Sequence, residues 1–428
     1  MSVLIAATRR PLIASTALNP FMPPPVPASS WGVASVSEFD EAMGDAAAEG
    51  SGDVVFTTDL EISDTVFVPR VGVPGDPGIT IRCAPGVSVK AANLNAAQTR
   101  PLFSRALGGG PDNWFTGVVK FVGFRLDGQN FTGQAGTDDS TNLRFNTFGE
   151  VVIDRCALIR SRKTVAFLTD VPKVTIRRSF FAHGPKDPVF IKSNGITHDV
   201  LVEDNLAIGF GDDFPASHTG PDAVVRRVVV RRNRSFDCNG IVLLGGSEDG
   251  TVNGQPAGVY ILDNEVYFCK SRGIMIGGDG NFNEGTYPLR NMEVTGNLVE
   301  NLRRPSSIGE GRYFMKAGAQ ETIPGTNIVA GNTFRRTVSS APTVASVYPD
   351  HGNLPLRIRE WLDLIQCPAE WKSFPEGVYQ ESSSTGFTTD TNTIGAMSTN
   401  IVGWLNQASN ASDLNAQIGD NTFDGIDP

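Results

Sequence analysis

One short phrase recurs between residues 118 and 334: an alternating apolar strand, one small or amide residue, and a second short apolar strand. The spacing between copies is irregular. A fixed strand phrase with variable inserts is typical of a solenoid, whose coils share strands and differ in their loops. The copies are VVKFVGFRL (118–126), VVIDRCALI (151–159), VTIRRSFFA (174–182), VLVEDNLAI (200–208), VVVRRNRSF (228–236), VYILDNEVY (259–267), NIVAGNTF (327–334) and a weaker one, MEVTGNLVE (292–300).

The sixth residue of the phrase forms a column in which asparagine predominates. If coils stack one rung (~4.8 Å) apart, these amides should hydrogen-bond to one another as a ladder. An antiparallel sandwich also has many short strands, but tight Asn-Gly or Asp-Gly hairpin turns would then join the phrases. The sequence therefore predicts an all-β, single-stranded parallel β-helix. The column is Gly123, Cys156, Ser179, Asn205, Asn233, Asn264, Asn297 and Asn332.

Composition limits the classes of partner. The net charge of −10 leaves no basic stripe to neutralise phosphates, which argues against a nucleic-acid partner. No segment approaches the ~20 apolar residues needed for membrane insertion, and the N-terminus lacks the basic–apolar–small order of a secretory signal. The cysteines and histidines have no metal-type spacing. Cys238 and Cys269 should stack on adjacent coils, either as buried thiols or as a disulfide.

The ends of the chain differ from its centre. Residues 1–35 should form an extended N-terminal arm, because the proline-rich run at 20–27 cannot form a helix. An amphipathic helix is expected to follow and to cap the coils of residues 36–340, with Ser35 or Ser37 as its N-cap and Gly50 as its stop.

The C-terminal part, residues 341–428, departs from the coil pattern. A short amphipathic helix over 358–366 is a candidate cap for the open end of the solenoid. Residues 373–428 are rich in Ser, Thr, Asn and Gly, which predicts either a mobile tail or a segment that orders only against other copies of the chain.

These features resemble the right-handed parallel β-helix of the pectate-lyase-like superfamily. The resemblance covers about 300 residues and rests on the capping helix, the line GFRLDGQN (123–130) and the asparagine column. The superfamily includes polysaccharide lyases, glycoside hydrolases, epimerases and bacteriophage spikes, so the fold alone does not decide the reaction.

Individual family motifs match only in part. Polygalacturonase-like hydrolases carry Asn-x-Asp, Asp-Asp, Gly-His-Gly and Arg-x-Lys on successive coils. Gly211–Asp212–Asp213 resembles the second element, whereas the third and fourth have no match. No acidic cluster with a catalytic arginine stands out as in calcium-dependent pectate lyases.

The overall plan resembles a bacteriophage spike, or that of a gene transfer agent. An extended arm precedes the capping helix and a polar segment follows the coils. The resemblance implies a homotrimer in the virion, attached to other virion proteins through the arm and bound to a bacterial surface polysaccharide. A free, secreted polysaccharide lyase or glycoside hydrolase and a purely structural spike are the alternatives.

Counting from the ladder column places two aspartates on adjacent rungs. Asp187 follows Ser179 by the same interval as Asp213 follows Asn205, so their carboxylates should lie roughly 5 Å apart, as in a retaining glycosidase. Lys186 and Asp212 fall in the preceding column and could form an ion pair. The plainer interpretation is that GPKDP and GFGDDFP are solvated turns whose acids cap backbone amides.

Further candidates for ligand binding lie in predicted loops. Loops after residues 243–246 and 275–278 should protrude side by side and could hold Ca²⁺ or sugar hydroxyls, although solvated turns would have the same composition. His218 is a candidate base, and exposed aromatics could stack on sugar rings. The loop candidates are Glu248, Asp249, Asp279, Trp114, Phe282 and Tyr287. No cofactor other than Ca²⁺ is expected.

Overall fold

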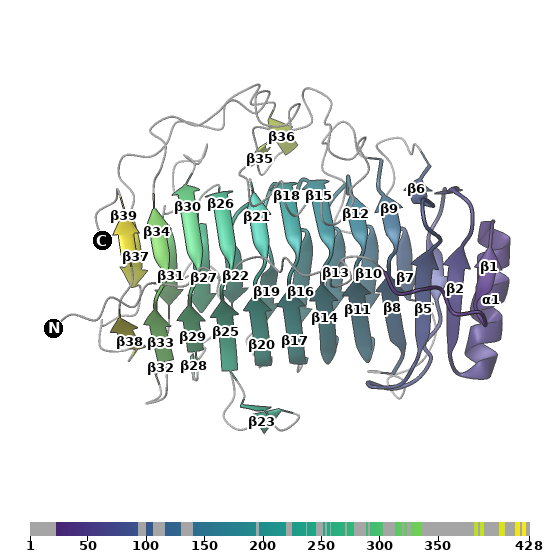
Figure 1. The fold of residues 1–428 in the computed structure, drawn as a ribbon, viewed down its shortest axis with the longest axis horizontal. Helices are drawn as coiled ribbons and strands as arrows, with labels where there is room; N and C mark the ends of the chain where they lie inside the picture. Colours follow the sequence, from purple (N-terminus) through teal and green to yellow (C-terminus); the bar gives the residue numbers. More distant parts are fainter. Residues whose placement is uncertain are drawn as a thin grey trace.

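The protein is a right-handed parallel β-helix of three parallel sheets, shown by a computed structural model (Figure 1). The predicted fold is therefore confirmed. The structure describes residues 23–92, 100–105, 116–129, 140–193, 197–219, 225–236, 238–244, 251–252, 255–256, 258–269, 272–277, 288–289, 292–302, 313–318, 321–322, 327–335, 381–383, 386–388, 402–406, 416–419 and 422–424.

Each coil contributes one strand to each sheet in the order A, B, C. Sheet A contains β1 (Trp31–Val33), β2 (Gly52–Phe56), β5 (Ile79–Cys83), β8 (Val118–Val122), β11 (Glu150–Asp154), β14 (Lys173–Arg177), β17 (Thr197–Glu203), β20 (Val225–Arg231), β25 (Gly258–Leu262), β29 (Met292–Thr295), β33 (Asn327–Ala330) and β38 (Ala416–Gly419). Sheet B contains β3 (Leu60–Ile62), β6 (Val89–Ala91), β9 (Arg125–Asp127), β12 (Ala157–Ile159), β15 (Phe180–Gly184), β18 (Leu206–Phe210), β21 (Arg234–Phe236), β26 (Glu265–Cys269), β30 (Leu298–Leu302), β34 (Thr333–Arg335) and β39 (Thr422–Asp424).

Sheet C carries the face on which the site described below lies. It contains β4 (Val66–Val68), β7 (Phe103–Arg105), β10 (Leu143–Asn146), β13 (Ala166–Thr169), β16 (Val189–Ser193), β19 (Ala216–Thr219), β22 (Ile241–Leu244), β27 (Arg272–Gly277), β31 (Tyr313–Gly318) and β37 (Val402–Asn406). Three short pairs lie outside the sheets: β23 (Thr251–Val252) with β24 (Gln255–Pro256), β28 (Pro288–Leu289) with β32 (Glu321–Thr322), and β35 (Glu381–Ser383) with β36 (Gly386–Thr388).

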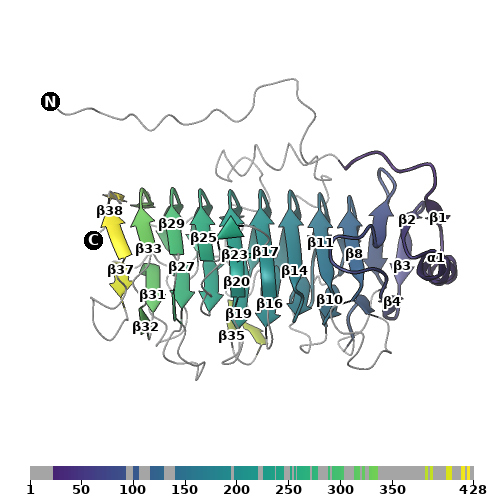
Figure 2. The same cartoon turned by 90° about the horizontal axis from the view of Figure 1, so that it is seen from below.

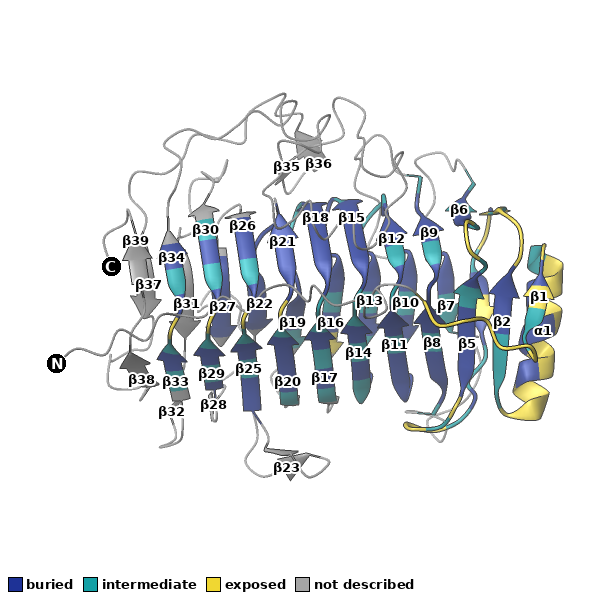
Figure 3. Ribbon diagram, in the orientation of Figure 1, coloured by how far each residue is buried: buried dark blue, intermediate teal, exposed yellow. Residues whose placement is uncertain are grey.

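The core fills the space between the sheets, where alternate residues of each strand are buried (Figure 3). Phenylalanine dominates its N-terminal half. Phe56, Phe103 and Phe121 come from successive coils, and the rings of Phe103 and Phe121 meet edge to face at 5.8 Å. Such pairs add to the hydrophobic stabilisation that burial provides.

Helix α1 (Val36–Glu49) closes the N-terminal end of this core. Ser35 is the N-cap, because its side chain accepts a hydrogen bond from the Glu38 amide, and Gly50 ends the helix at φ 78°. Both predictions are confirmed. Phe39 points inward and stacks on Phe56 with a centroid distance of 5.3 Å. The helix thus covers apolar strand residues that would otherwise face water.

Both predicted boundaries of the coil region need correction. Strand β1 lies before α1 and pairs with β2, so the sheets begin within the segment expected to be an arm. Strands β37, β38 and β39 extend sheets C, A and B, so the coils continue well beyond residue 340. The C-terminal residues complete a coil by pairing with their own chain. The helix expected at 358–366 lies outside the described residues.

The asparagine ladder is present as predicted, at the corner between sheets A and B. In each pair of neighbouring coils, the side-chain oxygen of one asparagine accepts hydrogen bonds from the amide and side chain of the preceding one, at 2.9–3.1 Å. Each Nδ2 also donates to a backbone carbonyl, as Asn233 does to Val202. The members are Asn205, Asn233, Asn264, Asn297 and Asn332, all at most 3% exposed.

The predicted first member of this column was wrong. Register pairs Val122 with Asp154, so Gly123 lies opposite Arg155 and Phe124 opposite Cys156. Gly123 instead belongs to the left-handed position that precedes the ladder, where its φ is 62° and that of Arg155 is 55°. A glycine adopts this conformation at no steric cost, which explains its presence there.

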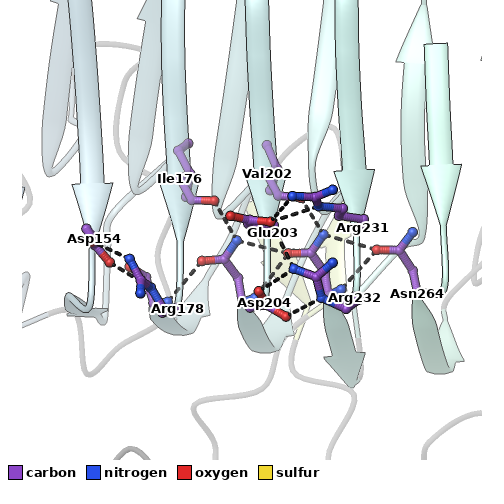
Figure 4. A network of polar contacts seen from close by, with 12 residues as sticks. Asp154, Ile176, Arg178, Val202, Glu203, Asp204, Arg231, Arg232 and Asn264 are labelled. Carbon is purple, nitrogen blue, oxygen red and sulfur yellow. Dashed lines mark hydrogen bonds and ion pairs between the residues drawn. The ribbon is translucent and has the colours of Figure 1, made fainter. Parts of the chain in front are cut away.

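Charged residues beside the ladder alternate in sign from coil to coil (Figure 4). Glu203 and Asp204 on one coil pair with Arg231 and Arg232 on the next, and the Arg232–Asp204 contact is 2.7 Å. Although burial acts to raise the pKa of Glu203, its hydrogen bonds and ion pairs with Arg231 and Arg232 lower it. Alternation of this kind favours one stacking order, because shifting a coil would bring like charges together.

Residues 23–29, which include the end of the proline-rich run, lie outside the three sheets (Figure 2). Residues 23–29 are exposed, yet Pro23 returns to the coils and packs over Gly123. A Cβ at Gly123 would come within 2.5 Å of the Pro23 ring, so glycine is also required there for this contact. Among the described residues, no helix is both long and apolar enough to cross a membrane.

Replacing a ladder asparagine should destabilise the fold strongly. Asn233→Ala removes the acceptor for Asn205 and leaves buried backbone groups without partners, which should lower the free energy of unfolding by about 2–4 kcal/mol. Urea unfolding measures this change. Thr175→Ala on the outer face of β14 should cost under about 0.5 kcal/mol. Equal costs for the two variants would contradict a stabilising ladder.

Candidate functional site

Two neighbouring corners between sheets B and C bring the predicted aspartates together. The corner after β15 carries Asp187, and the corner after β18 carries Asp213 one rung away. The Asp213 amide donates a hydrogen bond to Asp187 Oδ1 at 3.1 Å, which confirms the predicted shared column. Gly211 permits this close stacking, because a Cβ there would collide with the Pro185 carbonyl oxygen.

A third carboxylate completes the acid cluster, which we define as Asp187, Asp212 and Asp213. One oxygen atom from each lies within 4.8 Å of the others. Asp212 accepts a hydrogen bond from Lys186 Nζ at 3.0 Å, so the predicted ion pair is present. Asp212 is the most accessible of the three, with 23% of its side chain exposed, whereas Asp187 is 7% and Asp213 4% exposed as residues.

Asn239 belongs to this site and was missed from the sequence. Its Nδ2 donates to Asp212 Oδ1 at 3.3 Å and its backbone amide donates to the Asp212 carbonyl. Register places Asn239 one rung beyond Asp213. Counting residues from the ladder asparagine did not place Asn239 in the column of Asp213, because the corner after β21 is shorter than the corner after β18.

The surroundings of Asp187 favour its protonated form. Burial, followed by the charges of Asp212 and Asp213, raises the pKa of Asp187 well above its ordinary value. The pKa of Lys186 is also raised, chiefly by Asp212. The site therefore places a carboxyl group that favours its protonated form beside a carboxylate whose charge Lys186 stabilises. A general acid and a base or nucleophile require this combination.

The outer face of sheet C adjoins the cluster and carries stacked aromatic rings. Phe167 and Phe190 stack at 5.1 Å, with the Arg144 guanidinium over the first and the His218 ring against the second. Because neighbouring groups cover the faces of both phenylalanines, a ligand on the sheet would meet their edges. Lys192 stands next to His218 in the register and is exposed. Within the described part of the chain, Lys192 forms no ion pair.

The structure corrects the predicted place of His218. It lies in strand β19 and not in a loop. Its ring packs against Phe190 with centroids 4.7 Å apart, and it is not part of the acid cluster. A role as the base for this cluster is therefore unsupported by the geometry, whereas contact with a ligand on sheet C fits its position.

The other predicted residues cannot be placed. Trp114, Glu248, Asp249, Asp279, Phe282 and Tyr287 lie outside the described residues. The Cys238 side chain is buried as a thiol and donates to the Phe236 carbonyl oxygen, so the buried-thiol alternative holds for this residue.

Of the comparisons with family models, curated proteins and solved structures, only the last gives a match. No protein-family model matches the sequence, and no curated protein matches it. Among solved structures, the chain is similar to a hyperthermoactive exopolygalacturonase from Thermotoga maritima at 12% identity, covering 73% of this chain and 87% of that one, with a TM-score of 0.40.

The raised pKa of Asp187 predicts how the stability of the fold changes with pH. Because folding raises the pKa of Asp187, this residue contributes its full stabilisation at pH values below the ordinary aspartate pKa of about 3.9. The stabilisation is lost as the pH rises toward the pKa that Asp187 has in the folded protein. Asp187→Asn keeps the oxygen that accepts from Asp213 but cannot ionise. The variant should be more stable than the wild type at pH 7 by about 1 kcal/mol or more, with the difference vanishing near pH 4.

Thermal and urea unfolding between pH 4 and pH 8 test this expectation. Asp64→Asn, at a side chain 74% exposed, is the matched control and should behave like the wild type throughout. A variant at residue 187 that is less stable at pH 7 would show that Asp187 is ionised in the folded protein.

Proposed function

We propose that this protein binds a bacterial surface polysaccharide along the outer face of sheet C and hydrolyses it at the acid cluster. The observation that carries the proposal is the approach of three carboxyl groups to within 4.8 Å, where burial and the neighbouring charges raise the pKa of Asp187. A corner that served only as a solvated turn would not bury two carboxyl groups side by side, because doing so costs stability.

Asp187 is the proton donor in this proposal and Asp212 the nucleophile. Asp187 gives its proton to the glycosidic oxygen while the Asp212 carboxylate attacks the anomeric carbon, and the bond to the leaving sugar breaks. Water then attacks the same carbon, gives a proton back to Asp187 and releases the Asp212 carboxylate. The short separation of the carboxylates favours this retaining route, since an inverting pair leaves room for a water molecule.

The remaining residues of the site position these two groups. Lys186 donates to Oδ2 of Asp212 at 3.0 Å, and Asn239 donates to Oδ1 at 3.3 Å. Asp213 raises the pKa of Asp187 by its charge and fixes its orientation through the backbone amide. The exposed Lys192 and half-buried His218 provide hydrogen-bond donors to the polysaccharide on the adjoining strands.

Substitution of either reacting carboxylate should abolish cleavage. Asp187→Asn and Asp212→Asn should each reduce the rate of reducing-end formation by about 10²–10⁴-fold, with Asp64→Asn unaffected. Candidate substrates are capsules and exopolysaccharides of bacterial hosts. Full activity in both variants would reject the assignment. Products with a new double bond would instead indicate a lyase, and retention of the glycan without shortening would indicate binding alone.

We further propose that the protein works as a spike subunit of a virion, with secretion as a free enzyme the alternative. The exposed proline-rich segment outside the sheets supports this setting, because an extended arm can attach to other virion proteins. The full-length chain should then be a homotrimer in solution. Analytical ultracentrifugation that shows only a 45.7 kDa monomer would contradict the spike proposal, while leaving the hydrolase proposal intact.

A further inference from the structure

The outer face of sheet C is open on one side of the acid cluster and closed on the other. Register defines one column of residues that crosses this face, with neighbouring members one rung (~4.8 Å) apart. Except on β19, each member lies between two core residues of its strand, so the column points outward. It runs through Arg144, Phe167, Phe190, Ala216, Val242 and Met275, on β10, β13, β16, β19, β22 and β27 in that order.

On the N-terminal side of the cluster this column is accessible. Arg144, Phe167 and Phe190 stack on one another and are half-buried. The exposed Lys192 lies on the same face, and Phe67 on the edge strand β4 is 40% exposed. Strands β7, β10, β13 and β16 are consecutive in the sheet, so they offer a ligand about 14 Å of open surface.

On the C-terminal side of the cluster the same column is buried. Val242 lies between two core residues of β22, and Met275 lies between two core residues of β27, so both side chains point away from the core. Val242 is nevertheless only 1% exposed and Met275 0%. Large apolar side chains on an outer face lose all contact with water only where other groups cover them. A ligand cannot lie on this part of sheet C.

The outer face of sheet B is closed beside the cluster as well. Register places Ala182, Ile208 and Phe236 in one column, next to the core column that contains Phe181 and Ala207. Ala182, Ile208 and Phe236 are at most 2% exposed. Of the two sheets that meet at the cluster, as far as the structure describes them, only the part of sheet C before β19 is open to a ligand.

The closed surface begins next to the reacting groups. Asp187 precedes β16 and Asp213 precedes β19, whereas Val242 is on β22, the next strand of the sheet. The distance from the cluster to the covered surface is therefore about one rung, or ~4.8 Å, which is close to the length of one sugar unit in an extended chain. The binding face is a blind groove with the acid cluster near its closed end.

We propose that the protein cleaves its polysaccharide from a chain end and releases short sugars, with Val242 and Met275 marking the closed end of the groove. An internal bond cannot lie at the cluster, because the chain would have to continue across β22 and β27, where the face is covered. The reaction is the hydrolysis described above, in which water adds across the glycosidic bond nearest the chain end. Cleavage from a chain end rests on the proposed function, whereas the blind groove does not.

Thiol labelling of the full-length chain tests the groove without a substrate. Ser104→Cys and Val242→Cys place a thiol in the same outward column, on the open and on the closed side. N-ethylmaleimide should modify the cysteine at 242 at least about 100-fold more slowly than the one at 104, because the reaction requires local opening. Mass spectrometry of the peptide that carries the new cysteine gives each rate. In urea the two rates should become equal, and equal rates in the folded protein would overturn the inference.

The size of the products tests cleavage from a chain end. The substrate is the purified bacterial capsule that gives new reducing ends with the wild type. Short sugars should appear from the first time point, and the viscosity of the solution should fall only in proportion to the sugar released. Fragments of many lengths with an early loss of viscosity would show internal cleavage and overturn the proposal. If no capsule is cleaved, the proposed function fails and cleavage from a chain end fails with it, while the labelling rates still decide whether the groove is blind.

Discussion

The side-chain hydrogen bond between one asparagine and the next along the ladder is the interaction on which the rest of this structure depends. Each buried amide satisfies a backbone donor on one coil and a carbonyl on another, so a coil can stack in only one register without leaving polar groups unpaired. The connections between coils differ in length, whereas this shared corner repeats and reinforces the register of the paired strands. The register it imposes is the reason that Asp187 and Asp213 meet.

The three corners of each coil divide structural and chemical roles. The corner between sheets A and B is short and repeats with little change, apart from charges that alternate in sign as between Glu203 and Arg231. The other corners vary in length and composition, and those between sheets B and C carry the acid cluster. Strands of sheet C adjoin this cluster, so a ligand bound there would contact rigid elements along its length.

Much of the fold could be predicted because its signals are local and repeated. The asparagine column, the Ser35 cap and the pairing of Lys186 with Asp212 all follow from fixed spacing along the chain. The failures arose where the count along the chain was out of register or where the spacing changes. Gly123 was misplaced because its phrase was counted from Val118, whereas Val119 is the partner of Val151. Asn239 was missed because its corner is shorter. The coil formed by β37, β38 and β39 escaped notice because a long insertion separates it from the others.

The central claim is that the ladder register packs three carboxylates closely enough to keep one protonated. Titration of the Asp187 carboxyl by carbon-13 NMR tests this most directly. The account predicts a pKa well above the ordinary value in the wild type and a lower one in Asp212→Asn. A pKa near 3.9 in both proteins would contradict it.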